Sequence, residues 1–146
     1  ERALPIFREL QDKGSEALLL KDLGYEYFSL DQYLSAIKFY EQALPIYQKV
    51  KLSNFIIYQE IKADEANVLV DLGTTYNEIS QYAKSLELYQ QALPIYQQVG
   101  DLKGVANVLI NLGNTYNNMS QYTKASELYQ QALQICQQIK DKHGQA

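Results

Sequence analysis

A long internal repeat constrains this sequence more than any other feature. The tripeptide Leu-Pro-Ile occurs at residues 4–6, 44–46 and 93–95, and a degraded copy, Leu-Gln-Ile, occupies residues 133–135. The first and last intervals are 40 residues and the middle one is 49. Residues 66–99 match residues 106–139 at 23 of 34 positions, so the nine extra residues lie before Ala66. A period of this length is typical of solenoids, in which one helical unit stacks on the next.

Each unit is predicted to contain two amphipathic helices, because small and apolar residues recur in it at helical spacing. Eight columns agree across the units: Ala17, Leu20, Leu23, Gly24, Tyr27, Ala36, Tyr40 and Ala43, then Ala66, Leu69, Leu72, Gly73, Tyr76, Ser85, Tyr89 and Ala92, then Ala106, Leu109, Leu112, Gly113, Tyr116, Ala125, Tyr129 and Ala132. A glycine inside a helix costs about 1 kcal/mol relative to alanine. We therefore expect the column glycines to allow the close approach of a neighbouring helix, and the column tyrosines to fill the core.

The Leu-Gly-x-x-Tyr, Ala-x-x-x-Tyr and Ala columns resemble the signature of the tetratricopeptide repeat family. The 40-residue period resembles the longer repeats of kinesin light chains, of the cell-polarity adaptors named for Leu-Gly-Asn, and of bacterial signalling proteins; residues 112–114 are that tripeptide. The resemblance covers essentially the whole chain. It implies an all-α, right-handed solenoid of stacked antiparallel helical hairpins.

We predict one solenoid domain over residues 1–146, built from about seven helices. The helices are placed near residues 1–12, 15–29, 32–50, 55–79, 81–99, 103–118 and 121–141. Residues 1–13 are assigned to a partial helix of a preceding repeat, 14–50 to repeat 1, 51–62 to an insertion, 63–99 to repeat 2 and 100–146 to repeat 3. The chain therefore has the pattern of a piece of a longer array.

Local signals place the breaks between these helices. Gly14 and the pair Gly100-Asp101 are expected to separate hairpins. Asp31, Ser80 and Ser120 precede the second helices and are expected to cap them.

The insertion contains an echo of the helix before it, since residues 55–61 parallel residues 44–50 eleven positions earlier. Eleven residues make about three helical turns, so the fourth helix is predicted to begin at Phe55. Its apolar residues Phe55, Ile56, Ile57 and Ile61 form a candidate self-association edge. The alternative is local packing against Tyr47 and Val50.

A stripe of polar residues marks the candidate binding surface. In stacked hairpins of this type the first helices line a concave face. The stripe contains Asn107, Asn111, Asn114, Asn117 and Asn118 in the third unit, Asn67, Asp71, Thr74, Asn77 and Glu78 in the second, and Lys21, Asp22 and Tyr25 in the first. Carboxamides offer both a donor and an acceptor, which suits the backbone of an extended peptide. The alternative is that the asparagines bridge adjacent helices or face water.

The family resemblance also implies peptide binding, because concave-face asparagines bind extended peptides in that family. The first two units are more acidic and more apolar than the third. We therefore expect a peptide with an apolar anchor near Tyr25 and Phe28, and with a basic residue near Asp71 or Glu78.

Other functions find little support in the sequence. Seventeen acidic and 13 basic residues give a net charge of −4 without a basic block, so nucleic acid is a poor partner. No run approaches the length of a membrane span. The lone cysteine, Cys136, favours a reducing, cytoplasmic setting, and with the single His143 it makes neither a zinc site nor a catalytic pair. We expect no cofactor and no enzymatic activity.

The leading hypothesis is therefore an adaptor or scaffold that binds a protein or peptide. The alternative is a structural spacer or self-association arm of a larger multidomain signalling protein, which acts through the insertion or the open solenoid ends.

Overall fold

Helices account for nearly all of the chain in the computed structural model, which describes residues 3–49 and 55–144, with side chains at 13–49, 58–142 and 144. The helices of this part are α1 (Ala3–Ser29), α2 (Tyr33–Lys49), α3 (Phe55–Glu78), α4 (Tyr82–Val99), α5 (Leu102–Asn118) and α6 (Tyr122–Gly144). None of them is both long and apolar enough to cross a membrane.

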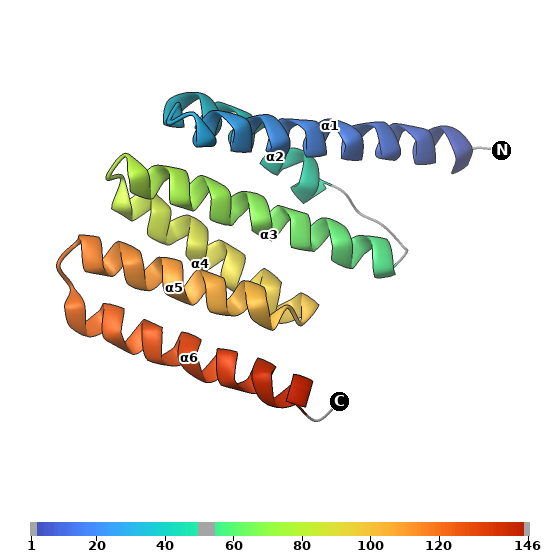
Figure 1. Ribbon diagram of the computed structural model, residues 1–146. Helices are drawn as coiled ribbons and strands as arrows, with labels where there is room; N and C mark the ends of the chain where they lie inside the picture. Colours follow the sequence, from blue (N-terminus) through green and yellow to red (C-terminus); the bar gives the residue numbers. More distant parts are fainter. Residues whose placement is uncertain (1–2, 50–54, 145–146) are drawn as a thin grey trace.

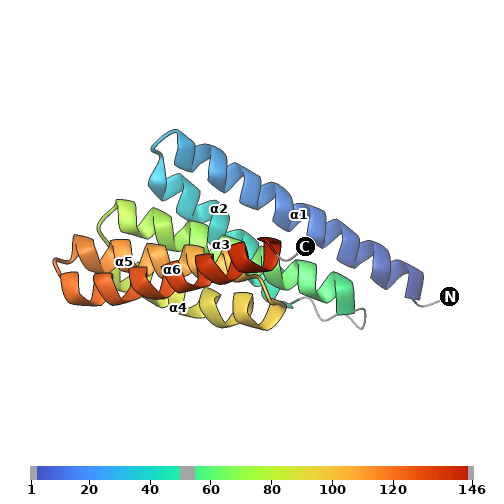
Figure 2. The ribbon, with the colours of Figure 1, turned by 60° about the horizontal axis from the view of Figure 1, so that its bottom comes forward.

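The helices pair as three antiparallel hairpins, α1–α2, α3–α4 and α5–α6, and the hairpins stack in chain order (Figure 1). The predicted all-α solenoid is confirmed. The hairpins are rotated along the stack, so that α1 runs obliquely to α3 and α5 (Figure 2).

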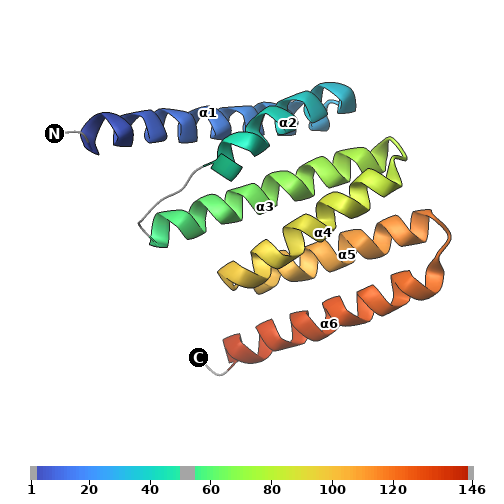
Figure 3. The same cartoon turned by 180° about the vertical axis from the view of Figure 1, so that it is seen from behind.

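The two helices of a hairpin occupy different layers of the stack. The first helices touch each other between hairpins, α1 with α3 and α3 with α5. In the described ranges the second helices make no such contacts, and α2 and α4 come forward when the molecule is seen from behind (Figure 3). We call the exposed side of α1, α3 and α5, the helices that also contact one another between hairpins, the inner face.

The predicted break at Gly14 is wrong, because α1 continues through it as one helix of 27 residues. Two of the predicted helices are thereby joined, which leaves six in the described part of the chain instead of about seven. A glycine lowers the stability of a helix without removing a backbone donor, so it does not end a helix as proline does.

The column glycines do allow close approach, as predicted. A Cβ built on Gly24, Gly73 or Gly113 would lie 2.5, 2.8 and 2.5 Å from the Cε1 atoms of Tyr40, Tyr89 and Tyr129, respectively. Each of these tyrosines comes from the second helix of the same hairpin. A fourth contact, between Gly104 and Tyr96, joins α4 to α5 and lies outside the repeat columns.

The prediction that Asp31, Ser80 and Ser120 cap the second helices is wrong. All three have left-handed backbones, with φ of 57°, 60° and 60°, and the chain reverses there between the two helices of a hairpin. The break at Gly100-Asp101 is confirmed, since Gly100 has φ 75° and the Asp101 carboxylate accepts a 2.9 Å hydrogen bond from the Gly104 amide.

Residues 55–62 of the insertion form the first turns of a long helix. α3 begins at Phe55, as predicted, but the side chains of Phe55, Ile56 and Ile57 lie outside the described residues. Ile61 is partly buried against the core cluster that contains Tyr47. Val50, which the local-packing alternative names with Tyr47, lies outside the described residues.

Candidate functional site

The residues predicted to bind a peptide lie along the inner face on three neighbouring helices. The exposed members are Asp22 and Tyr25 on α1, Asn67 and Glu78 on α3, and Asn107, Asn114, Asn117 and Asn118 on α5. The half-buried members are Lys21 on α1, Asp71, Thr74 and Asn77 on α3, and Asn111 on α5. The face is therefore continuous across the three hairpins.

Tyrosines from the second helices hold two of the asparagines. The Tyr96 hydroxyl donates to Asn67 Oδ1 over 2.6 Å, and the Tyr129 hydroxyl donates to Asn114 Oδ1 over 2.7 Å. Each bond engages the carboxamide oxygen and leaves the NH₂ group as a donor. The second helix of each of these two hairpins therefore orients a carboxamide on the first helix. The sequence pattern did not reveal these hydrogen bonds.

One pair follows the alternative interpretation, in which asparagines bridge neighbouring helices. Asn118 Nδ2 donates to Asn77 Oδ1 at 3.4 Å, which joins α5 to α3. The carboxamides of Asn107, Asn111 and Asn117 form no hydrogen bond with another described residue. Most of the asparagine stripe thus retains its hydrogen-bonding capacity.

The first hairpin departs from this pattern. Leu18 stands where the second and third units have Asn67 and Asn107, so the hydroxyl of Tyr47, the counterpart of Tyr96, has no amide above it. Tyr47 is 3% exposed, and its hydroxyl is buried without a hydrogen-bond partner among the described residues.

The charged residues of the inner face are concentrated between α1 and α3. Lys21 Nζ lies 3.0 Å from Asp64 Oδ1, which ties the two helices together and engages the lysine within the fold. Burial raises the pKa of Asp71 from 3.8 to about 6, and Lys21 opposes that rise. Asp71 is therefore a carboxyl group held in an unfavourable environment for its charge.

A small cavity adjoins Asp71. It measures about 60 Å³ and is lined by Tyr25, Phe28, Tyr40, Asp71 and Thr74, which come from α1, α2 and α3. Sequence reasoning assigned Tyr40 to the core and missed its place here. The signal in the sequence was the residue that faces this tyrosine from the first helix of the hairpin. Tyr25 stands at that position, whereas the other two units have the smaller Thr74 and Asn114.

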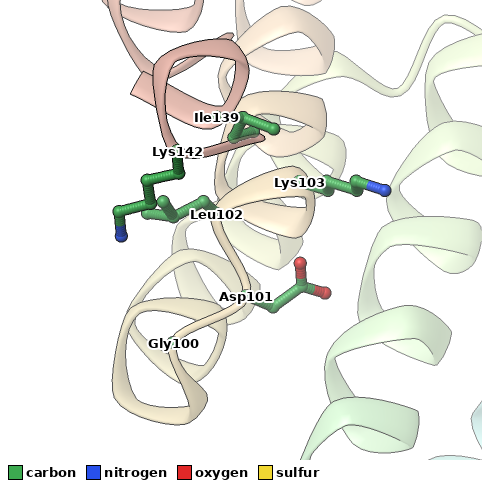
Figure 4. A pocket seen from close by; sticks show the side chains of 6 residues that line it. All are labelled: Gly100, Asp101, Leu102, Lys103, Ile139 and Lys142. Carbon is green, nitrogen blue, oxygen red and sulfur yellow. The ribbon is translucent and has the colours of Figure 1, made fainter. Parts of the chain in front are cut away.

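Two larger hollows measure about 380 Å³ each. One lies between the start of α5 and the end of α6, where Lys103 and Lys142 extend away from each other (Figure 4). The other lies between α2 and α4, where the Tyr76 hydroxyl donates to Glu41 over 2.8 Å and Lys84 Nζ sits 4.8 Å from the centre of the Tyr76 ring.

The described residues bring together no group of three or more histidine, cysteine, aspartate and glutamate side chains that suits a metal ion. Cys136 is exposed, and the side chain of His143 lies outside the described residues.

Several solved structures share the fold. The apo form of RapI has a TM-score of 0.75 at 21% identity, and the match covers 86% of this chain but only 43% of RapI. The TPR domain of Arabidopsis FLU has a TM-score of 0.73 at 14% identity, with 86% of this chain and 98% of that one covered. The TPR2AB domain of yeast Sti1, solved as a pHSP90 complex, has a TM-score of 0.66 at 19% identity, with 90% and 48% covered.

No curated protein sequence is significantly similar to this chain. Family models described as the tetratricopeptide repeat match residues 64–138 and 22–49. The first match alone spans half of the 146 residues. The chain therefore belongs to the tetratricopeptide repeat family.

Proposed function

We propose that this protein is an interaction module, and that it binds an extended segment of a partner protein along the inner face of α1, α3 and α5. The observation that carries the proposal is the row of asparagines on α3 and α5. Tyr96 and Tyr129 hold the oxygens of two of these carboxamides from beneath, so that NH₂ donors remain for peptide carbonyl groups.

The affinity that such a face can provide is moderate. A net gain of about 1 kcal/mol per hydrogen bond, over four or five bonds, together with one buried anchor gives a micromolar dissociation constant. A micromolar constant suits a reversible adaptor. The net charge of −4 favours a protein partner over nucleic acid, and we place this binding in the cytoplasm.

The structural neighbours supply general support. The Sti1 domain of the same fold was solved as a complex with pHSP90, which is an example of this architecture in protein binding.

The test is selection from a randomised peptide library, followed by calorimetry with the selected peptides. Asn107→Ala combined with Asn111→Ala removes two carboxamides that hold no other described residue, so the fold should keep its melting temperature. We expect roughly tenfold weaker binding or more, since two bonds contribute about 2 kcal/mol.

Gln130→Ala with Gln131→Ala is the matched control, because both glutamines are exposed on α6, outside the inner face. Unchanged affinity in the Asn107 and Asn111 double variant would rule out this face as the binding site.

A second function, self-association, rests on apolar residues exposed at the two ends of the stack. Leu19 on α1 is 61% exposed, whereas its counterparts Val68 and Val108 are fully buried by the preceding hairpin. Leu133 on α6 is 58% exposed, whereas its counterpart Leu93 is packed against the core. The two ends thus carry the two halves of the interface that joins neighbouring hairpins.

Sedimentation over a range of concentrations tests this second function. Leu19→Glu and Leu133→Glu should each lower the average mass if copies associate end to end. Leu34→Glu is the control, because Leu34 is exposed and its counterparts Ala83 and Thr123 are exposed too. A monomer at every concentration would exclude end-to-end association, and Phe55→Ser with Ile57→Ser tests the insertion in the same assay.

A further inference from the structure

The cavity beside Asp71 has an unusual lining for its small size. Three of its five lining residues are aromatic, Tyr25, Phe28 and Tyr40, and the other two are Asp71 and Thr74. Aromatic faces attract cations, and a carboxylate accepts hydrogen bonds from them. The lining therefore combines the two kinds of group that recognise a positive charge.

The Tyr40 hydroxyl is free to serve a ligand. Its counterparts are both engaged, since the Tyr89 hydroxyl lies 3.0 Å from Thr74 Oγ1 and the Tyr129 hydroxyl donates to Asn114 over 2.7 Å. Tyr25 occupies the equivalent position on α1, and Tyr40 forms no hydrogen bond with any described residue. Tyr40 is only 1% exposed as a whole residue, and its hydroxyl has no hydrogen-bond partner among the described residues.

The Asp71 carboxylate is only partly compensated by its surroundings. It forms no hydrogen bond or ion pair with a described residue. Lys21, the basic group whose charge acts on Asp71, is paired with Asp64 over 3.0 Å. Burial raises the pKa of Asp71 to about 6, which is the response of a carboxyl group that lacks a nearby donor or full countercharge. A bound cation would supply both.

We propose that this cavity binds the side-chain cation of a lysine or arginine in the peptide that lies on the inner face. The inference rests on the proposed function. Asp71 accepts hydrogen bonds from the cation, the Tyr40 hydroxyl oxygen accepts a further one, and the rings of Tyr25 and Phe28 enclose the aliphatic part of the side chain. The cavity thus fixes the register of the peptide against the asparagines of α3 and α5.

The cavity also sets a preference within the peptide. A cavity of about 60 Å³ is large enough for a terminal ammonium or guanidinium group. A neutral side chain of similar length would fill the volume and leave the Asp71 carboxylate and the Tyr40 hydroxyl without partners, which disfavours it.

The experiment uses randomised peptides, selected in parallel on the unmodified chain and on the Asp71→Asn variant. We expect lysine or arginine to be enriched at one fixed position with the unmodified chain, and the enrichment to disappear with Asp71→Asn. Glu127→Gln is the control, because it removes an equal charge from an exposed position on α6.

A double-mutant cycle then measures the contact directly. In the best selected peptide, replacing the basic residue by norleucine should weaken binding about tenfold or more with the unmodified chain, since hydrogen bonds to charged groups are among the stronger ones. The same replacement should have less than about a twofold effect with Asp71→Asn, and a reduced effect with Tyr40→Phe. Exchange of lysine for arginine in the peptide shows which cation fits better.

The outcomes separate the two proposals. Peptides that depend on Asn107 and Asn111 but show no basic position would overturn the cation cavity and leave the proposed function standing. Enrichment that survives Asp71→Asn unchanged would also overturn it. If no peptide is selected at all, the proposed function fails and the cation cavity fails with it.

Discussion

At the scale of single residues, the repeat explains which side chains have partners and which do not. Tyr96 has its partner because Asn67 faces it, and Tyr47 lacks one because the first unit has Leu18 at that position. The core tyrosines thus occupy equivalent positions with different hydrogen bonding. Their energetic contributions should differ accordingly.

This difference can be measured with two identical substitutions. Tyr96→Phe removes a hydrogen bond of 2.6 Å and leaves the Asn67 oxygen without its donor, so it should lower the free energy of unfolding by about 1 kcal/mol. Tyr47→Phe removes a buried hydroxyl that has no described partner, so it should be neutral or stabilising. Urea unfolding of both variants decides the matter, and equal losses would contradict the assignment.

The raised pKa of Asp71 predicts that the free energy of unfolding depends on pH. Its pKa is about 6 in the folded protein against an ordinary value of 3.8, so the folded state holds the proton more tightly than the unfolded state. The free energy of unfolding should therefore fall by up to about 3 kcal/mol as the pH rises from 3.8 to 6, and the penalty should persist above 6.

Asp71→Asn should accordingly raise stability at pH 7 and change it little at pH 4, as urea unfolding at both values would show. Asp22→Asn is the control, because Asp22 occupies the same position on α1 and is exposed. An equal gain from Asp71→Asn at both pH values would show that burial of the charge is not the cause.

At the scale of the helix, glycines in different surroundings have opposite effects. Gly24 and Gly14 both lie inside α1, but a Cβ on Gly24 would meet the Tyr40 ring, whereas nothing lies within 4 Å of one on Gly14. Only the first glycine serves the packing between helices. The second remains a local weakness of a continuous helix.

Gly14→Ala should therefore stabilise the protein by about 0.5–1 kcal/mol through helix propensity. Gly24→Ala should destabilise it by about 1–3 kcal/mol, because the tyrosine ring has to move out of a well-packed position. Thermal unfolding followed by circular dichroism measures both changes. A stabilising Gly24→Ala would mean that α1 and α2 separate without cost.

At the scale of the whole molecule, stability is expected to be greatest in the middle of the stack. Both core clusters draw on α3, and its Val68 and Leu69 are almost fully buried. The end helices bury one side only, and Leu19, Tyr129 and Leu133 are exposed there. In a solenoid each unit is stabilised by its neighbours, so a unit with one neighbour opens more readily.

Hydrogen exchange should show this gradient. The amides of residues 66–72 and 106–112 should exchange most slowly, and those of the outer turns of α6 should exchange most rapidly, because local opening needs less free energy there. Mass spectrometry of peptide fragments resolves the two classes. Uniform protection along the chain would indicate that the three hairpins unfold as a single unit.

The sequence alone was enough to predict the repeat and the hairpins, because helical periodicity and column residues such as Gly73 and Tyr89 depend on local geometry. It was insufficient at Gly14 and at Ser80, where the same residue types suit a break or a cap as well as the conformation that forms. The asparagines of α5 were predicted as a stripe, but their hydrogen bonds were not.

What only the tertiary structure decided is which residues of different hairpins meet. The cavity of Tyr25, Tyr40 and Asp71 joins three helices, and the bond between Asn77 and Asn118 joins two hairpins. Such contacts depend on the rotation and spacing of one hairpin against the next, which arise from the packing of the whole stack. The sequence therefore determined the repeating unit and its faces, and the stacking determined which residues of neighbouring hairpins meet at the Asp71 cavity.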